Sequence, residues 1–174
     1  MDYFSPFAAN WSKDLAALMT RRNNKILEIG SFEGFATCWM LEHLVRGKGA
    51  SITCVDIFYP TYAKEFKRNV AKTGKAPHVR IKRGFSKDIL PKLPQESFDF
   101  IYVDGSHVAV DVLTDSLMAW SLLKRGGIMT FDDYLLDEQQ EVSVREVVDF
   151  FLRCHAGQFD LVRKDRQLTL RKKH

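Results

Sequence analysis

Residues 25–37 read K-I-L-E-I-G-S-F-E-G-F-A-T, and this stretch decides the fold. A short apolar run leads into a turn with two glycines, and a helical pattern follows. Glu28, Gly30 and Gly34 form an acidic-x-Gly-x-x-x-Gly turn, where glycine permits backbone angles that a Cβ would resist. Such a turn lets a ligand approach the main chain at the end of the strand. A plain strand-to-helix turn of an α/β protein is the alternative interpretation.

Strand and helix patterns alternate along the rest of the chain. The predicted strands are short, apolar and rich in β-branched or aromatic residues, as is typical of parallel strands covered on both faces. They cover residues 25–29, 51–56, 79–82, 98–103 and 127–131. Helical patterns cover residues 35–45, 62–72, a short piece around 86–90, 108–123 and 143–153.

The C-terminal end has a different pattern. Residues 159–163 and 167–171 read as two strands joined by a tight turn, and are therefore antiparallel. We predict an α/β fold: a doubly wound, seven-stranded, mostly parallel, Rossmann-like sheet with a C-terminal antiparallel hairpin. An NAD-binding fold more often ends with another parallel strand, so the hairpin favours S-adenosylmethionine as the ligand.

Length and composition indicate one domain over residues 1–174, with a helical segment at 1–22 and a catalytic core at 23–174. The 45% apolar content is that of a globular protein. No targeting or membrane-spanning pattern is found, so we expect a soluble, cytoplasmic protein with no membrane partner. The net charge of +4 is concentrated near the C-terminus, which favours a solvated end over an RNA contact.

Polar residues follow nearly every predicted strand, where open α/β sheets bind their ligands. Asp56 ends the second strand, and its carboxylate could accept both ribose hydroxyls of an adenosine or cap the turn. Gly84 and Ser86 follow the third strand and could flank an adenine ring. Ser86 could also serve as the N-cap of the following helical turn.

Asp104 follows the fourth strand, and Asp132 and Asp133 follow the fifth. Neighbouring strand ends would bring these three carboxylates together, and they would repel one another unless a cation lay between them. Oxygen ligands suit Mg²⁺, whereas the sequence offers no cysteine and histidine set of the kind zinc prefers. Two ordinary turns, with one aspartate holding the ligand's amino group, are the alternative.

His107 lies three residues beyond Asp104, at the predicted start of a helix above the same site. A neutral imidazole there could remove a proton from a substrate hydroxyl. A structural role is the alternative for this histidine.

The chain resembles the class I S-adenosylmethionine-dependent methyltransferases, in particular the metal-dependent O-methyltransferases of the catechol, caffeoyl-CoA and macrocin types. The resemblance runs from about residue 26 to 152. It depends on the motifs E-I-G-S-F-E-G-F, C-V-D, G-F-S-K-D-I-L-P-K-L, F-I-Y-V-D-G-S-H, L-L-K-R-G-G-I-M-T-F-D-D-Y and V-R-E-V-V-D-F-F.

The resemblance implies roles for particular residues. It places Asp104, Asp132 and Asp133 on the metal, and His107, with Asp104, at the catalytic centre. The cofactor would be bound at its methionine end, its ribose and its adenine. The predicted cofactor-binding residues are Glu28, Gly30, Ser31, Phe32, Gly34, Thr37, Asp56, Ile57, Gly84, Phe85, Ser86 and Asp104.

The chain departs from this family in several ways. Asp133 replaces the asparagine of the catechol branch, which favours the macrocin-like side, and Thr37 could replace a hydroxyl absent at Ala36. The segment after the metal motif is short, with only residues 134–142, so the pocket would be open or completed by a second subunit in a homodimer. The aromatic N-terminus (Tyr3, Phe4, Phe7 and Trp11) could act as a lid, although core packing is favoured.

We therefore expect a methyltransferase that uses S-adenosylmethionine and Mg²⁺, or another hard divalent cation, to methylate the hydroxyl of a small molecule. A metal-independent enzyme and an RNA-directed enzyme are alternatives. The Asn/Asp-Pro-Pro-aromatic motif of base N-methylation is absent. A non-catalytic cofactor-binding module and an NAD-dependent oxidoreductase are further alternatives. The intact carboxylates disfavour the first, and the lack of a full G-x-G-x-x-G spacing disfavours the second.

Overall fold

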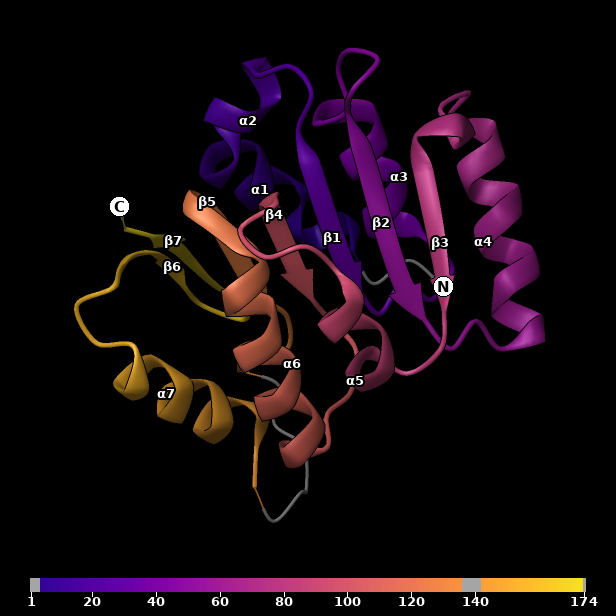
Figure 1. Cartoon of the computed structure of the whole chain (residues 1–174). Helices are drawn as coiled ribbons and strands as arrows, with labels where there is room; N and C mark the ends of the chain where they lie inside the picture. The colour runs from indigo at the N-terminus through magenta and orange to yellow at the C-terminus, as the bar shows by residue number, and fades with distance from the viewer. Residues whose placement is uncertain (1–3, 136–141, 174) are drawn as a thin grey trace.

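The computed structural model describes residues 4–135 and 142–173. In these residues a seven-stranded sheet has the strand order β3-β2-β1-β4-β5-β7-β6 (Figure 1). The strands are β1 (Lys25–Ile29), β2 (Ser51–Asp56), β3 (Val79–Arg83), β4 (Phe98–Val103), β5 (Leu123–Phe131), β6 (Phe159–Lys164) and β7 (Leu168–Lys172).

The first five strands pair in parallel, and β7 pairs antiparallel with both β5 and β6. The predicted mostly parallel, doubly wound sheet with an antiparallel C-terminal hairpin is therefore confirmed. The chain reverses its direction of winding between β1 and β4, and parallel sheets bind ligands at such a point.

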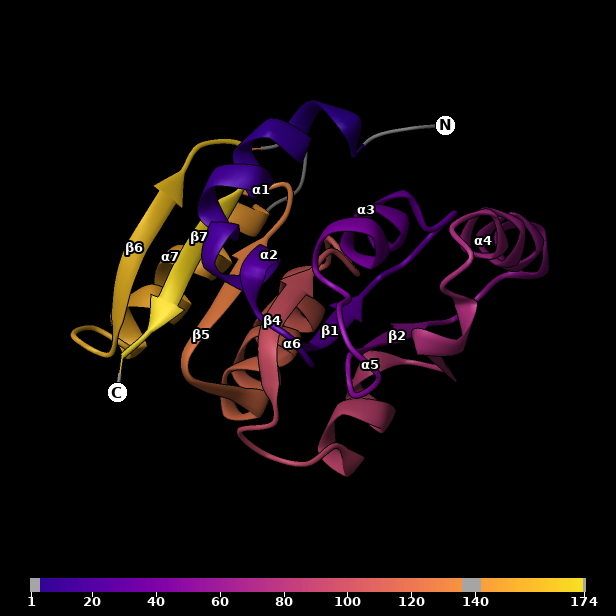
Figure 2. The ribbon, with the colours of Figure 1, turned by 90° about the horizontal axis from the view of Figure 1, so that it is seen from above.

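Helices cover both faces of the sheet (Figure 2). One face carries α1 (Ala8–Asp14), α2 (Ala16–Thr20), α3 (Phe35–His43) and α4 (Pro60–Lys72). The other carries α5 (Ser86–Ile89), α6 (Ala109–Leu122) and α7 (Val144–Cys154). Short 3-10 turns lie at Ser5–Phe7, Ala76–His78 and Leu90–Lys92. None of the helices in the described residues has both the length and the apolar character needed to cross a membrane.

Two apolar clusters fix these layers. Trp11 and Phe66 pack with β1 and β2 on one face, while Trp120 and Phe151 pack with β5 and β7 on the other. The helix α7 begins with a capping box, in which Ser143 and Glu146 each bond the other's backbone N–H. The amphipathic helices therefore bury their apolar faces against opposite sides of the sheet.

β6 and β7 differ from their predicted bounds by one residue at one or both ends, and two other strands, β3 and β5, differ more. The strand β3 lies at the sheet edge, and most of its residues are exposed, so it is not covered on both faces. Charged side chains such as Arg80 and Lys82 suit that position, because they disfavour pairing with a further strand. The strand β5 begins at Leu123 rather than at residue 127, and it reaches this length through a register shift opposite Phe98 and Phe100.

Basic residues near the C-terminus belong to the β6–β7 hairpin. Arg163 is ion-paired with Asp14 of α1. Lys172 Nζ donates hydrogen bonds to the backbone oxygens of Trp120 and Leu123, at 3.0 and 2.9 Å. Arg163 and Lys172 therefore hold the hairpin to its neighbours, so these two residues are not part of a solvated end as expected.

Candidate active site

The turn after β1 is pressed against the end of β4. Gly30 has a φ of +83°, and a Cβ added there would lie 1.8 Å from the backbone oxygen of Asp104. Gly34 has a φ of +81° at the N-cap of α3, and a Cβ there would lie 2.7 Å from the Phe66 ring. Both glycines are therefore required by their backbone angle and by their close neighbours.

Glu28 lies in β1 with its side chain fully buried beneath this turn. Its Oε2 atom accepts hydrogen bonds from Ser31 Oγ at 2.7 Å and Thr37 Oγ1 at 2.5 Å. Burial nevertheless raises the pKa of Glu28 to about 7. Oε1 is also buried and accepts no hydrogen bond in the part of the chain that the structure describes. A cationic ligand group is the natural partner for this oxygen.

Asp56, at the end of β2, holds the same turn from the other side. Its Oδ2 atom accepts the backbone N–H groups of Ser31 and Phe32, at 2.8 and 3.1 Å. Its Oδ1 atom accepts the N–H of Phe58 at 2.5 Å. Phe32 has a φ of +45°, an angle that these hydrogen bonds help to maintain. The structure therefore shows the capping role that was the alternative to ribose binding.

The residues after β3 begin beside Asp56, because the Gly84 N–H donates to the Asp56 backbone oxygen at 2.9 Å. The helix α5 begins at Ser86, its N-cap is Phe85, and no side chain caps it, so the predicted N-cap role of Ser86 is wrong. The Ser86 hydroxyl instead forms a hydrogen bond with the Asp115 carboxylate of α6. Burial raises the pKa of Asp115 to about 6. The Phe85 ring is exposed, with Lys87 Nζ 5.6 Å from its centroid.

Asp104, Asp132 and Asp133 come together as predicted, with one oxygen from each carboxylate within 4.8 Å of the others. They meet because Val103 of β4 and Phe131 of β5, each preceding an aspartate, are in register. Burial and the charges of Asp132 and Asp133 raise the pKa of Asp104 well above its ordinary value. A bound cation would relieve this repulsion, and three hard oxygen donors suit Mg²⁺.

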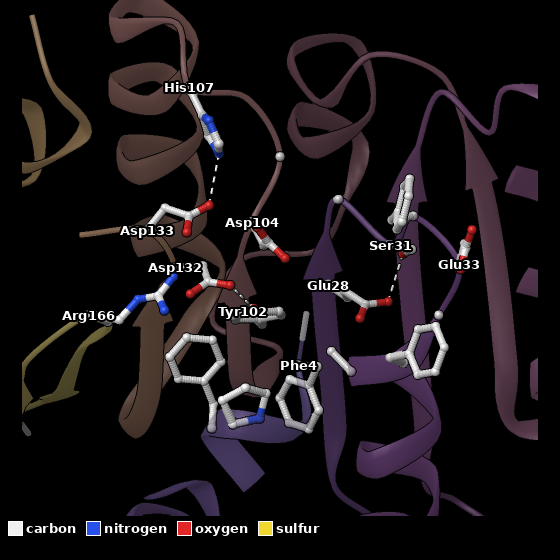
Figure 3. Close-up of a pocket in the computed structure, with 18 residues that line it drawn as sticks. Phe4, Glu28, Ser31, Glu33, Tyr102, Asp104, His107, Asp132, Asp133 and Arg166 are labelled. Atoms are coloured by element: carbon white, nitrogen blue, oxygen red, sulfur yellow. Dashed lines mark hydrogen bonds and ion pairs between the residues drawn. The ribbon is translucent and has the colours of Figure 1, made fainter. Parts of the chain in front are cut away.

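His107 lies in the loop before α6, beside this cluster (Figure 3). Its Nε2 atom is 2.9 Å from Asp133 Oδ2. Asp133 itself has a φ of +53°, an angle that aspartate tolerates better than most residues. The imidazole is therefore held at the cluster, as the sequence predicted.

A hydrogen-bond chain fixes Asp132, and the sequence analysis missed it. Tyr102 OH donates to Asp132 Oδ2 at 2.5 Å, and Gln167 Nε2 donates to Asp132 Oδ1 at 2.9 Å. Gln167 Oε1 accepts from Trp11 Nε1 of α1 at 2.8 Å. Tyr102 could have been found, because it precedes Asp104 by two residues and strand side chains repeat with that period. Nothing local indicates Gln167 or Trp11.

A cavity of about 610 Å³ joins the turn to the aspartates (Figure 3). Predicted residues lining it are Glu28, Gly30, Ser31, Phe32, Gly34, Asp104, His107, Asp132 and Asp133. Six predicted cofactor residues are not part of its lining as described: Thr37, Asp56, Ile57, Gly84, Phe85 and Ser86. The cavity therefore unites the methionine-end residues with the predicted metal site, and leaves the ribose and adenine residues at the β2–β3 side.

The N-terminal aromatic residues have two roles. Phe4, Phe7 and Trp11 are buried, and the Phe4 and Trp11 rings meet edge to face at 4.7 Å, so the favoured core packing is confirmed. Phe4 and Phe7 also line the cavity, with Pro6 and Arg166. Tyr3 lies outside the described residues, as do residues 136–141 of the short segment after the aspartates.

Two catechol O-methyltransferases are among the curated proteins that this chain matches. The protein from Niastella koreensis is 34% identical over 104 residues, which are 58% of this chain and 45% of that protein. The protein from Mycobacterium tuberculosis is 30% identical over 125 residues, which are 68% of this chain and 50% of that protein. The chain thus spans about half the length of the curated relatives it matches.

Solved structures share the fold over nearly the whole chain. The O-methyltransferase TomG from Streptomyces achromogenes, solved in complex with SAM, has a TM-score of 0.77 at 19% identity, covering 98% of this chain and 81% of TomG. An O-methyltransferase from Bacillus cereus, solved with SAH, has a TM-score of 0.77 at 17% identity. The match covers 99% of this chain and 83% of the Bacillus cereus protein.

A family model for a methyltransferase domain matches residues 27–134, more than half of the chain. The matched region begins in β1 and contains the glycine turn, Asp56 and all three clustered aspartates. The chain therefore belongs to this methyltransferase-domain family.

Proposed function

We propose that this chain is an S-adenosylmethionine-dependent O-methyltransferase that uses a divalent cation, Mg²⁺ by preference, and a small hydroxylated acceptor. One observation carries the proposal: a single cavity has the unpartnered oxygen of Glu28 at one end and three converging aspartates at the other. A ligand with an ammonium group would fit the first end, and a cation with substrate oxygens would fit the second.

Glu28 would accept the ammonium group of the cofactor's methionine moiety through Oε1. Ser31 and Thr37 hold the opposite oxygen, so the carboxylate is already oriented before the ligand binds. When bound, the cofactor supplies a methyl group activated by its sulfonium. Positioning of the acceptor against that methyl group is then the protein's main task, and positioning can lower a barrier by several kcal/mol.

Asp56 would accept a sugar hydroxyl of the same cofactor. A carboxylate has about four acceptor positions, and three backbone N–H groups already bond Asp56 in the structure. One acceptor position would remain for a hydroxyl. Ile57, Gly84, Phe85 and Ser86 would border the adenine on the β2–β3 side.

Asp104, Asp132 and Asp133 would hold the cation. Their spacing fits one ion, and burial, together with the charges of Asp132 and Asp133, raises the pKa of Asp104, which a bound cation would counteract. When bound, a divalent cation lowers the pKa of a substrate hydroxyl and orients it. His107, 2.9 Å from Asp133, would accept the hydroxyl proton directly or through a water molecule.

Calorimetry with S-adenosylmethionine and S-adenosylhomocysteine tests the first part of the proposal. We expect both to bind wild-type protein, and no binding at millimolar concentration would contradict the function. Asp132→Ala tests the metal: it should retain S-adenosylhomocysteine binding but lose methyl transfer to catechol. Asp160→Ala is the matched control, because it removes an exposed aspartate on β6 whose partner, Lys173, lies at the surface of the hairpin. Full activity of Asp132→Ala, or of wild type in excess chelator, would favour the metal-independent alternative.

A further inference from the structure

The turn between β6 and β7 is held rigidly on both sides of Arg166. Arg163 donates to both carboxylate oxygens of Asp14 on α1, at 2.5 and 2.9 Å. Asp165 Oδ2 accepts from Arg163 Nη1 at 3.1 Å, and Asp165 Oδ1 accepts the Gln167 N–H at 3.0 Å. The turn is therefore fixed to the N-terminal helix, and the position of Arg166 follows from it.

Arg166 extends from this turn to the rim of the cavity, beside Asp132 (Figure 3). Its guanidinium carbon lies 5.5 Å from the centroid of the Phe7 ring. Phe4, Pro6 and Phe7 form an apolar wall on the same side. A planar cation thus lies against an aromatic surface at the entrance to the acid cluster.

Arg166 is not required to satisfy the hydrogen-bonding capacity of Asp132. Both oxygens of Asp132 already accept hydrogen bonds, one from Gln167 and one from Tyr102. The guanidinium carries five N–H donors in a planar fork, which matches a carboxylate in two parallel hydrogen bonds. Its geometry is therefore suited to a ligand.

The surroundings limit the charge of that ligand. Three aspartates lie in the same cavity and keep a net negative charge even with a divalent cation bound, so a dianion such as a phosphate monoester would be repelled more strongly than a single carboxylate. The aromatic and proline wall favours a flat, apolar body. The cavity of about 610 Å³ must also admit part of the methyl donor, which leaves room for an acceptor about the size of one ring.

We propose that Arg166 selects acceptors with a carboxylate, so that the acceptor is an aromatic hydroxy acid with its hydroxyls at the aspartates and its carboxylate at Arg166. This inference rests on the proposed methyltransferase function and adds the substrate class. Arg166 is a specificity residue in this scheme, and methyl transfer itself does not involve it.

A matched pair of ligands tests the proposal: protocatechuate, which carries a ring carboxylate, and protocatechuyl alcohol, which carries a neutral hydroxymethyl group. Binding of each is measured by calorimetry on protein saturated with S-adenosylhomocysteine and Mg²⁺. We expect wild type to bind the acid roughly tenfold more tightly, the equivalent of one charge-assisted contact. Arg166→Ala should abolish this preference, and Arg166→Lys should retain part of it.

Lys173→Ala is the control, because it removes the same charge from a residue paired with Asp160, and it should keep the preference. The inference would be overturned if Arg166→Ala lost the same factor of affinity for both ligands, or if wild type did not prefer the acid to the alcohol. The inference would also be overturned if phenyl phosphate competed with protocatechuate more tightly than benzoate does. If neither catechol binds while S-adenosylhomocysteine still does, the substrate class is wrong and the donor site stands. If S-adenosylhomocysteine also fails to bind, both proposals fall.

Discussion

The two ends of the cavity differ in how the chain builds them. The glycine-turn end consists of Glu28, Ser31 and Thr37, which are neighbours in sequence and bond one another. The acid-cluster end consists of Asp104, Asp132, Asp133, His107 and Arg166, which come from two strand ends, a loop and the terminal hairpin. At the first end the hydroxyls of Ser31 and Thr37 satisfy one oxygen of Glu28, whereas at the second end burial and two neighbouring carboxylates raise the pKa of Asp104 well above its ordinary value.

Because the two ends are built differently, we expect substitutions at each end to affect different properties of the protein. Changes in the glycine turn should act on stability, because close backbone contacts and a buried carboxylate are involved. Most changes in the acid cluster should act on function, because like charges that are held together contribute little to stability. The following predictions, from the largest expected effect to the smallest, test this separation.

Gly30→Ala should give the largest loss of stability. The new Cβ would overlap the backbone oxygen of Asp104, and the positive φ adds strain, so we expect a loss of about 4 kcal/mol or more. Gly74→Ala is the matched control, because Gly74 also has a positive φ but nothing within 4 Å of the added atom. Its loss should be about 1 kcal/mol. Urea unfolding measures both, and equal losses would show that contact with β4 is not the cause.

Glu28→Gln should raise stability above neutral pH. The native pKa of about 7 exceeds the ordinary 4.5, so the folded protein retains a proton that the unfolded chain has released. Stability therefore falls as pH rises from about 4.5 to 7, by on the order of 3 kcal/mol in total. Near pH 8 the Glu28→Gln variant should be more stable than wild type by this amount, and near pH 4 the two should have nearly the same stability.

The same variant should bind S-adenosylhomocysteine more weakly, because it lacks the negative charge that would hold the ammonium group. Urea unfolding across pH and calorimetry provide the two measurements. A stability difference that is independent of pH would contradict the assignment of the buried charge. Unchanged affinity would contradict the role of Glu28 in binding.

His107→Ala should lower kcat by about 100-fold, the usual range for a general base, and leave S-adenosylhomocysteine affinity unchanged. His78→Ala is the control, because His78 bonds the Ala50 backbone oxygen and is not among the cavity-lining residues described. Rates are compared at saturating catechol and Mg²⁺. An unaltered kcat would assign His107 a structural role beside Asp133.

Trp11→Phe and Gln167→Ala form a double-mutant cycle on the chain that holds Asp132. Each change breaks the 2.8 Å hydrogen bond, and we expect a coupling of about 1 kcal/mol in urea unfolding. Both single variants should also weaken Mg²⁺ binding several-fold, because Asp132 loses part of its support. Additive effects on stability would show that the two side chains do not act together.

Much of the fold could be predicted because its signals are local. The apolar runs of β1, β2 and β4 were located at their observed limits, since each is short, apolar and bounded by a turn. The edge position of β3 could not be predicted, because a short run does not reveal how many neighbours it has. The role of Ser86 was mistaken for a related reason: its partner, Asp115, lies on a different helix.

The amino-acid sequence by itself determined the glycine turn, the buried glutamate beneath it and the aspartates that end two strands. Backbone angles, hydrophobic period and residue type suffice for these features. Only the tertiary structure decided the contacts of Gln167, which bonds Asp132, 35 positions away in the sequence, and Trp11, 156 positions away. The tertiary structure also placed Arg166 at the same cavity. Those contacts depend on the order in which strands pair, which places the C-terminal hairpin and the N-terminal helix beside one strand end.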